Sequence, residues 1–507
     1  MKKKQKAEPE SRRKSSYQGN SRNNSKSGGL TFSEKKRLIQ LKHILSGKSI
    51  EKEKPTTAQK TITFEKMFRD GICQVSHRYY TKMVEFFDIN YSLLEVDEQA
   101  DILAQYSKLI NYFDPSVRFE LVLFNRQVNE QMLTEQFDIP WQEDDFNDIR
   151  EEYTEMLKKQ AAKGNNGIIK SKYLIFGVES NGYKEAKSRL NNIEKDVIRN
   201  LNNIGTLARG LDGKERLRIL HEYFNQDTME PFRFSFKDLA ESGKSVKDYI
   251  APPGFDFRYP NRFKSGNMYG CVSYLDIIAP KFTDELIKQL LDIDANLTIS
   301  MHMQTEDPVK AIKKLKAVIS NIQKMKIEEQ KKAVRSGYDM DILPTDIVTY
   351  EKDTLEFLDD LNTSNQKMIN MTFLITCYGR TKRELESLMQ KEIQDVAGDD
   401  VLQNLMAEMI QYLQEQGLMA SAPIGCNETG IERTLSTKST AILVPFCTQE
   451  LFMPAPAIYY GLNALSNNMI MADRKRLRTP NGVILGTPGS GKSFSAKREI
   501  LSCFLIT

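Results

Sequence analysis

The sequence predicts a protein of mixed α/β and α+β class with several domains. The chain has 507 residues, of which 40% are hydrophobic and 28% charged, enough for about three globular domains. From about Thr61 onward, apolar runs of strand length alternate with stretches of helical periodicity. Residues 481–507 join an apolar run, a glycine-rich motif and a helix-compatible segment. These patterns predict α+β modules followed by an α/β unit.

Residues 1–60 are predicted to be a basic disordered tail. They contain 17 Lys or Arg and 5 Asp or Glu, a net charge of +12, whereas the rest of the chain sums to −8. So few apolar residues cannot offset the entropy of ordering the segment. The tail is either a solvated extension or a segment that holds anionic lipid or nucleic acid by charge.

The composition argues against several classes of protein. No apolar run approaches the roughly 18 residues of a membrane-spanning helix, and the N-terminus has no secretory signal. Six cysteines and four histidines are scattered without a CxxC pair, so neither a metal site nor a disulfide framework is expected. The expected location is the cytoplasm.

A first α+β module is predicted over residues 61–250. The segment 97–113 places Ile102, Tyr106, Leu109 and other apolar residues at helical spacing. The segment "RFELVLFN" alternates like a half-buried strand, and "SKYLIFGVES" is a strand followed by an amphipathic helix.

A second module, over residues 251–420, repeats this order. The strand–turn–helix segment 371–396 resembles the segment 172–197, about 200 residues earlier. We therefore predict two related modules, each with ferredoxin-like β-α-β pieces, although any two strand–turn–helix segments look somewhat alike. The junction is expected near "APPGFDFRYPNRFKSG". Residues 421–480 form a β-rich segment, in which the basic residues Arg474, Lys475, Arg476 and Arg478 are predicted to be a solvated hairpin tip.

The motif GxxxxGK[ST] is typical of a phosphate-binding loop. The glycines let backbone N–H groups point at phosphate oxygens, and a helix that begins at the loop adds its partial positive charge. The run "GVIL" before the motif is predicted to be a buried strand, and the residues after it a helix. The motif consists of Gly486, Thr487, Pro488, Gly489, Ser490, Gly491, Lys492 and Ser493.

The residue types of this motif predict binding of ATP and Mg²⁺. Lys492 would place its charge on the β- and γ-phosphates, and the Ser493 hydroxyl would ligate Mg²⁺. Pro488 has no N–H, so the cradle depends on Gly489 through Ser493. Hydrolysis also needs an acidic Mg²⁺ ligand and a group that orients water. Asp88 and Asp276 could serve only in a permuted topology.

We therefore expect no catalytic residue within this chain. Residues 481–507 are expected to be an incomplete P-loop NTPase domain of RecA-like type, in which the chain stops.

Three segments near the end of the chain belong together: "ERTLSTKSTAILVPF", "YYGLNALSNNMIMADR" and "TPNGVILGTPGSGKSFSAKREI", preceded by "YLDIIAPKFTDELIKQLLDIDANLTISMHMQTEDPVKAIKKLKAVISNIQ". Together they resemble the conjugal-transfer ATPases of type IV secretion systems, in particular those of Gram-positive conjugative elements. The resemblance runs from about Thr61 to the end and implies a cytoplasmic motor at the inner face of the cell membrane. It further implies homo-oligomers, peripheral membrane association through channel subunits, and indirect action on DNA by energising channel assembly and transfer.

Two alternatives stay open at this point. One is a non-catalytic scaffold or binding partner of a membrane channel whose loop is vestigial. The other is a related DNA-pumping ATPase outside secretion.

Overall fold

The computed structural model describes residues 57–506 with gaps. The gaps are 90, 92–93, 128–137, 162–167, 228–231, 278–284, 294, 337–343, 364–365, 394–404, 447–452, 454–456, 464–468 and 477–479. The predicted tail, residues 1–60, lies outside the described residues except for its last four positions.

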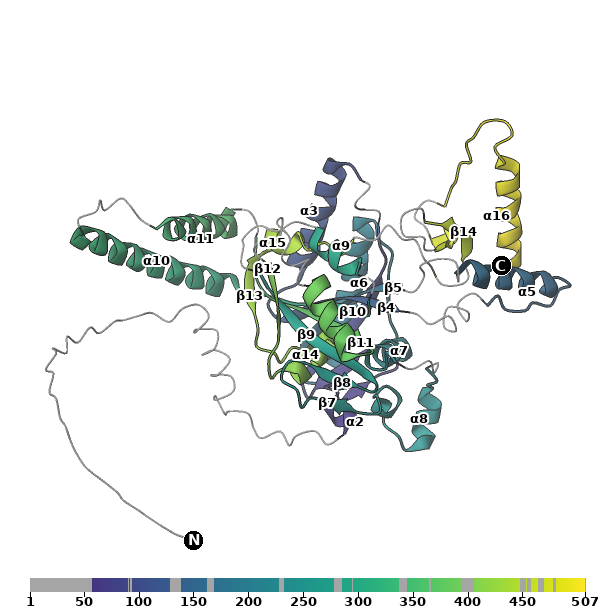
Figure 1. The fold of residues 1–507 in the computed structure, drawn as a ribbon, viewed down its shortest axis with the longest axis horizontal. Coiled ribbons are helices and arrows are strands. Elements are labelled where there is room, and N and C mark those ends of the chain that lie inside the picture. Colours follow the sequence, from purple (N-terminus) through teal and green to yellow (C-terminus); the bar gives the residue numbers. More distant parts are fainter. Residues whose placement is uncertain are drawn as a thin grey trace, which may run out of the picture. The chain divides into compact units, whose positions relative to one another are not determined.

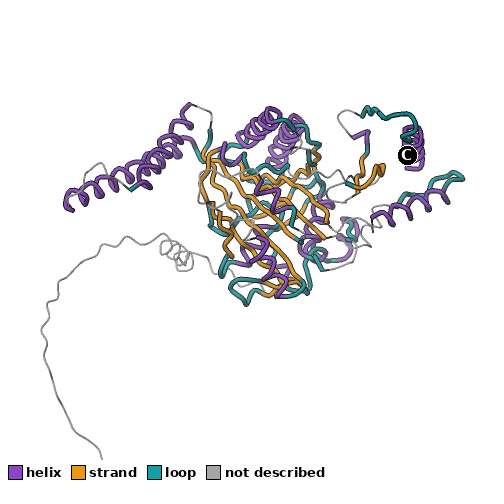
Figure 2. The backbone as a smooth tube through the Cα atoms, turned by 45° about the horizontal axis from the view of Figure 1, so that its top comes forward, coloured by secondary structure: helices purple, strands orange, loops and turns teal. Residues whose placement is uncertain are grey.

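The described strands form one large antiparallel sheet and a separate hairpin (Figures 1 and 2). The sheet has 13 strands, ten of them in the order β1-β2-β3-β5-β4-β10-β11-β9-β8-β7, with β6 beside β3, β12 beside β9 and β13 beside β11. The strands are β1 (Lys66–Met67), β2 (Cys73–Ser76), β3 (Tyr79–Phe86), β4 (Val117–Gln127), β5 (Ile168–Glu179), β6 (Ala208–Gly210), β7 (Phe255–Asp256), β8 (Phe263–Ser265), β9 (Met268–Ile277), β10 (Leu297–Thr305), β11 (Met368–Gly379), β12 (Leu405–Met409), β13 (Arg433–Ser436), and the hairpin β14 (Ile458–Leu462) and β15 (Met469–Ala472).

Helices connect the strands. They are α2 (Ala58–Thr61), α3 (Val96–Tyr112), α5 (Asn147–Ala161), α6 (Tyr183–Ile204), α7 (Gly213–Phe224), α8 (Phe236–Ser242), η2 (Val246–Tyr249), α9 (Glu285–Leu291), α10 (Pro308–Ser336), α11 (Thr345–Thr363), α12 (Lys382–Ser387), η3 (Leu388–Ile393), α14 (Gln414–Ser421), α15 (Thr437–Ala441), η5 (Arg474–Arg476) and α16 (Lys492–Ile506). None of these helices is both long and apolar enough to cross a bilayer.

The sheet consists of two halves with the same strand order. In the first half, β3, α3, β4, β5, α6 and β6 follow each other along the chain, and the strands lie in the order β6-β3-β5-β4. In the second half, β9, α9, β10, β11, α12 and β12 give the order β12-β9-β11-β10. The predicted α+β class with a mixed strand and helix content is confirmed.

The two halves join edge to edge through β4 and β10. These strands pair antiparallel over eight positions, from Leu297 opposite Asn125 to Gln304 opposite Arg118. Each half would otherwise present this strand as an unpaired edge, so the pairing satisfies both rows of backbone groups.

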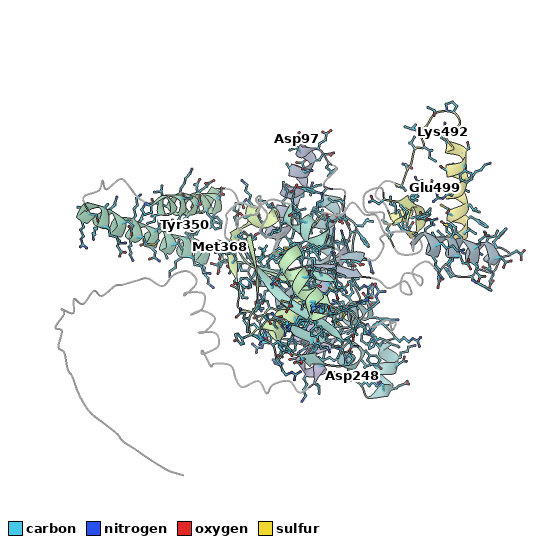
Figure 3. The ribbon with its side chains drawn as sticks, viewed as in Figure 1. Asp97, Asp248, Tyr350, Met368, Lys492 and Glu499 are labelled. Carbon is cyan, nitrogen blue, oxygen red and sulfur yellow. The ribbon has the colours of Figure 1, made fainter. Side chains whose placement is uncertain are left out.

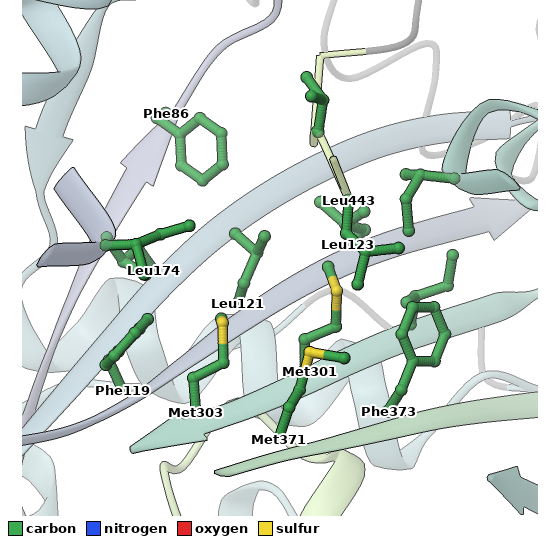
Figure 4. Close-up of a cluster of buried hydrophobic side chains, with 14 of the residues drawn as sticks. Phe86, Phe119, Leu121, Leu123, Leu174, Met301, Met303, Met371, Phe373 and Leu443 are labelled. Atoms are coloured by element: carbon green, nitrogen blue, oxygen red, sulfur yellow. The ribbon is translucent and has the colours of Figure 1, made fainter. Parts of the chain in front are cut away.

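Side chains alternate between the two faces of the sheet. On β4, Leu121 and Leu123 belong to one apolar cluster, and Val122 and Phe124 belong to the other. The first cluster, part of which is drawn in Figure 4, takes Met301 and other residues from both halves. Helices α3, α6 and α9 contribute to it, whereas α7 and α14 contribute to the opposite face. The core is therefore continuous across the junction of the halves.

Local sequence explains the best-formed helices. In α6, Leu190, Ile193, Val197 and Leu201 recur every three or four residues and are buried against the sheet. The helix ends at Gly205, whose φ of 103° favours glycine.

Both halves carry a helical insertion in the same connection, between their second and third strands: α5 between β4 and β5, and α10 with α11 between β10 and β11.

A buried polar cluster lies where the halves meet. Glu120 of β4 is directly opposite His302 of β10. The Glu120 carboxyl accepts hydrogen bonds from Ser300 Oγ at 2.7 Å and from the Gly425 N–H at 2.8 Å, and His302 Nε2 lies 2.6 Å from the Ala420 carbonyl oxygen. Burial raises the pKa of Glu120 to about 8 and lowers that of His302 to about 4.

These shifts predict a pH-dependent stability. Above pH 6.5, the ordinary pKa of histidine, His302 is neutral in both the folded and the unfolded state, so it no longer contributes to the pH dependence. From there up to the folded pKa of Glu120, about 8, only the folded state retains the Glu120 proton, and the free energy of unfolding falls as pH rises. We expect Glu120→Gln to remove this loss, as measured by urea unfolding at the two ends of the window. Glu179→Gln, at an exposed site on neighbouring β5, should retain it. Equal slopes in wild type and Glu120→Gln would contradict this account.

Candidate functional site: a glycine-rich loop at the start of α16

The predicted phosphate-binding loop lies directly before α16. Residues 481–487 have no regular structure, Pro488 and Gly489 form a turn, and α16 begins at Lys492. The Ser490 N–H donates to the Thr487 carbonyl at 3.2 Å, and the Ser495 N–H donates to Gly491 at 3.0 Å. The helix that the sequence predicts after the motif is therefore confirmed.

Each of the three glycines in the motif lies where the backbone geometry or a close neighbour disfavours a larger side chain. Gly489 and Gly491 have φ values of 84° and 85°, the left-handed region that disfavours other residues. At Gly486, an added Cβ would lie 2.5 Å from Ser490 Oγ, inside contact distance. Larger side chains at these three positions would thus distort the loop.

Lys492 folds back over the loop. Its Nζ donates hydrogen bonds to the carbonyl oxygens of Gly486 at 2.7 Å and Thr487 at 2.8 Å. The ammonium group therefore lies beside the turn, at the end of the helix where the first N–H groups have no partner within the helix. A cation, helical N–H groups and a turn with two left-handed glycines suit a phosphate. Ser493 follows in the first turn of α16, exposed to solvent.

The prediction of a strand immediately before the loop is wrong. Residues 482–485, the run "GVIL", have no regular structure, and the side chains of Val483 and Leu485 are 82% and 87% exposed. A buried strand of an α/β sheet needs neighbouring strands on its edges and helices on its faces. No strand among those described pairs with this run.

The middle of α16 is held by the hairpin β14–β15. The Tyr460 hydroxyl donates to Glu499 Oε1 at 2.9 Å, and Arg474 forms an ion pair with the same carboxylate at 2.9 Å. Arg498 donates to the Tyr459 carbonyl at 3.0 Å. Figure 3 labels Lys492 at the loop end of α16 and Glu499 farther along the helix.

The basic segment is therefore not the solvated hairpin tip that the sequence predicts. Arg474, Lys475 and Arg476 form the turn η5 after β15, not the connection between β14 and β15. Arg474 forms an ion pair with Glu499. A Cβ added at Gly482 would lie 2.0 Å from the Arg474 guanidinium. Arg478 lies outside the described residues.

The end of α16 is held by α5, which the sequence did not reveal as part of this site. Arg150 Nε donates to the Leu505 carbonyl at 3.0 Å, and the Tyr153 hydroxyl donates to Ser502 Oγ at 3.1 Å. Below them, Leu157 of α5 packs in an apolar cluster with residues on and beside the hairpin. Arg150 and Leu505 are 355 positions apart in the sequence, so no local pattern could have paired them.

The upstream acids considered as Mg²⁺ ligands have other places. Asp88 forms an ion pair with Lys172 of β5, and both side chains are nearly buried. Asp276 lies on β9, opposite Met406 of β12. Within the part of the chain that the structure describes, no group of three or more His, Cys, Asp or Glu side chains is arranged to hold a metal ion.

The contact of Tyr460 with Glu499 predicts a measurable effect on α16. Tyr460→Phe removes one hydrogen bond to a charged acceptor and should lower the opening free energy of α16 by about 1–2 kcal/mol. Hydrogen exchange of the amides after Glu499 should speed up accordingly. Tyr350→Phe, on exposed α11, is the matched control and should leave α16 unchanged. Unaltered protection of α16 in Tyr460→Phe would show that the hairpin does not hold the helix.

Comparison with known protein families yields no matching family model, and comparison with curated proteins yields no match. The residues of the loop and of its supports are therefore the basis for a functional proposal.

Proposed function

We propose that this chain is an ATP-binding motor protein of a conjugative type IV secretion system. One observation carries the ATP-binding part of this proposal: the motif Gly486 to Ser493 forms a turn at the start of a 15-residue helix, with the Lys492 ammonium held at that turn. Backbone N–H groups, the start of a helix and a lysine side chain are the groups with which phosphate-binding loops hold nucleotide phosphates.

Each loop residue has a chemical role in this proposal. The N–H groups of Gly489 through Ser493 hydrogen-bond to phosphate oxygens, and Lys492 exchanges its two carbonyl partners for the β- and γ-phosphates. The Ser493 hydroxyl ligates Mg²⁺. ATP itself supplies the phosphoanhydride bond whose hydrolysis drives the motor.

The architecture supports the assignment at a coarser level. We infer that each half of the sheet is a ferredoxin-like module, since the chain order and lateral order of its four main strands fit that fold. Residues 481–507 would then belong to a P-loop unit of RecA-like type. Val483, Leu485 and Phe494 expose apolar side chains in and beside the loop, and such a patch is typical of a surface that contacts other protein.

The wider role comes from the family that the sequence resembles. We propose that the motor hydrolyses ATP as a homo-oligomer at the cytoplasmic face of the membrane, bound to channel subunits, and acts on DNA through the channel. Its second Mg²⁺ ligand would be an acidic residue outside the loop.

The loop assignment predicts the effect of a lysine substitution. Lys492→Ala should weaken binding of a fluorescent ATP analogue by about a hundredfold or more, because it removes a charge-assisted contact to two phosphates. Lys497→Ala, on an exposed turn of the same helix, is the matched control and should bind like wild type.

The result also separates the proposal from its main alternative. If wild type binds no ATP, the loop is vestigial and a scaffold role is favoured. Equal affinity in wild type and Lys492→Ala would overturn the assignment of the site.

A further inference from the structure

A buried arginine binds the C-terminal end of α16. Arg150 of α5 is 1% exposed, although it carries a full charge. Its Nε donates to the Leu505 carbonyl in the last turn of α16, and its Nη1 and Nη2 donate to the two Asp144 carboxylate oxygens at 2.5 and 2.6 Å. Asn147 Oδ1 accepts a further bond from Nη1 at 3.0 Å.

This contact is rigid for a physical reason. A guanidinium that is bound to a carboxylate through two parallel hydrogen bonds has little freedom to rotate. A cation at the end of a helix also interacts favourably with its last carbonyl groups. Two further contacts keep the geometry in place. Tyr153 of α5 contacts Ser502, and the ring of Phe146, directly before α5, packs edge to face with that of Phe504.

The hairpin contact at Glu499 divides α16 into two arms. The loop lies at its first residue, Glu499 is held by the hairpin, and Leu505 is held by Arg150. At 1.5 Å per residue, the arms from Glu499 to Lys492 and to Leu505 are each about 10 Å long. A helix held near its middle transmits a tilt at one end to the other.

We propose that α5 senses the nucleotide state of the loop through α16, with Arg150 as the positioning residue. The inference rests on the proposed function. Phosphate binding requires Lys492 to leave the Gly486 and Thr487 carbonyls, which rearranges the turn and the first residues of α16. The position of α16 therefore changes the free-energy difference between the nucleotide-free and the nucleotide-bound loop. Such a dependence is the condition for coupling between two sites.

The two coupled sites are far apart in the chain. Helix α5 is the insertion between β4 and β5 of the first half of the sheet. Nucleotide at residues 486–493 would thus be reported to a segment more than 300 positions earlier in the sequence.

The chain carries a natural reporter of this contact. Trp141 is the only tryptophan in the sequence, and it lies three residues before Asp144. Its indole is 74% exposed, and the next residue, Gln142, donates its N–H to Asn147 Oδ1 at 3.0 Å. Asn147 also contacts Arg150, so a shift of the arginine alters the surroundings of Trp141.

The test is a titration of the full chain with Mg²⁺·ATP, following Trp141 emission and, separately, displacement of a fluorescent ATP analogue. In wild type, both signals should saturate at the same ATP concentration. In Arg150→Ala, the analogue should still be displaced, but the Trp141 response should fall about fivefold or more. Arg150→Lys should not restore it, because an ammonium cannot form the paired bonds to Asp144.

Matched variants isolate the effect. Lys159→Ala, an exposed position on α5, should respond like wild type, and Trp141→Phe should give no emission change. Thermal unfolding and circular dichroism establish that each variant is folded. If Arg150→Ala does not fold, Asp144→Asn replaces it, since it weakens the carboxylate that orients the arginine.

The outcomes distinguish the two proposals. If no ATP binds to wild type, the proposed function fails and this inference fails with it. If ATP binds but Trp141 emission does not change, or changes equally in Arg150→Ala, the coupling is refuted while the nucleotide site stands.

Discussion

The pairing of β4 with β10 is the constraint on which the rest of the fold depends. Each strand is the outer member of its own half, and their eight-position antiparallel ladder converts two small sheets into one. Because the register is set there, Leu121 and Leu123 face one core and Val122 and Phe124 the other. A shift by one residue would exchange these faces along the whole seam.

The same junction contains two ionisable side chains that burial keeps neutral near pH 7. Glu120 and His302 face each other across the ladder. The last turn of α14 supplies the Ala420 carbonyl next to His302, and the segment after α14 supplies the Gly425 N–H that donates to Glu120. These polar groups are costly to bury, but each has a partner. They tie a distant part of the chain to both halves at once, which an apolar pair could not do with the same specificity of position.

The two halves of the sheet differ in what their helical insertions contact. Both halves have an insertion between their second and third strands, but the insertions differ. The pair α10 and α11 packs on itself and on Met368 through a small apolar cluster. By contrast, α5 packs with the hairpin β14–β15 and holds α16. Through it, an element of the first half becomes a support of the glycine-rich loop.

The sequence by itself determined the elements with strong periodicity and the loop. The spacing of Ile102, Tyr106 and Leu109 predicts α3, the alternation in "RFELVLFN" predicts β4, and the glycine pattern predicts a turn before a helix. These signals are local, since they depend on side chains within one or two turns of each other. The tertiary structure alone decided the pairing of β4 with β10, the exposure of "GVIL" and the contact of Arg150 with Leu505. Strand pairing and burial depend on partners far away in the chain, so a strand-like run without neighbours stays exposed, and a buried arginine looks like any surface residue in the sequence.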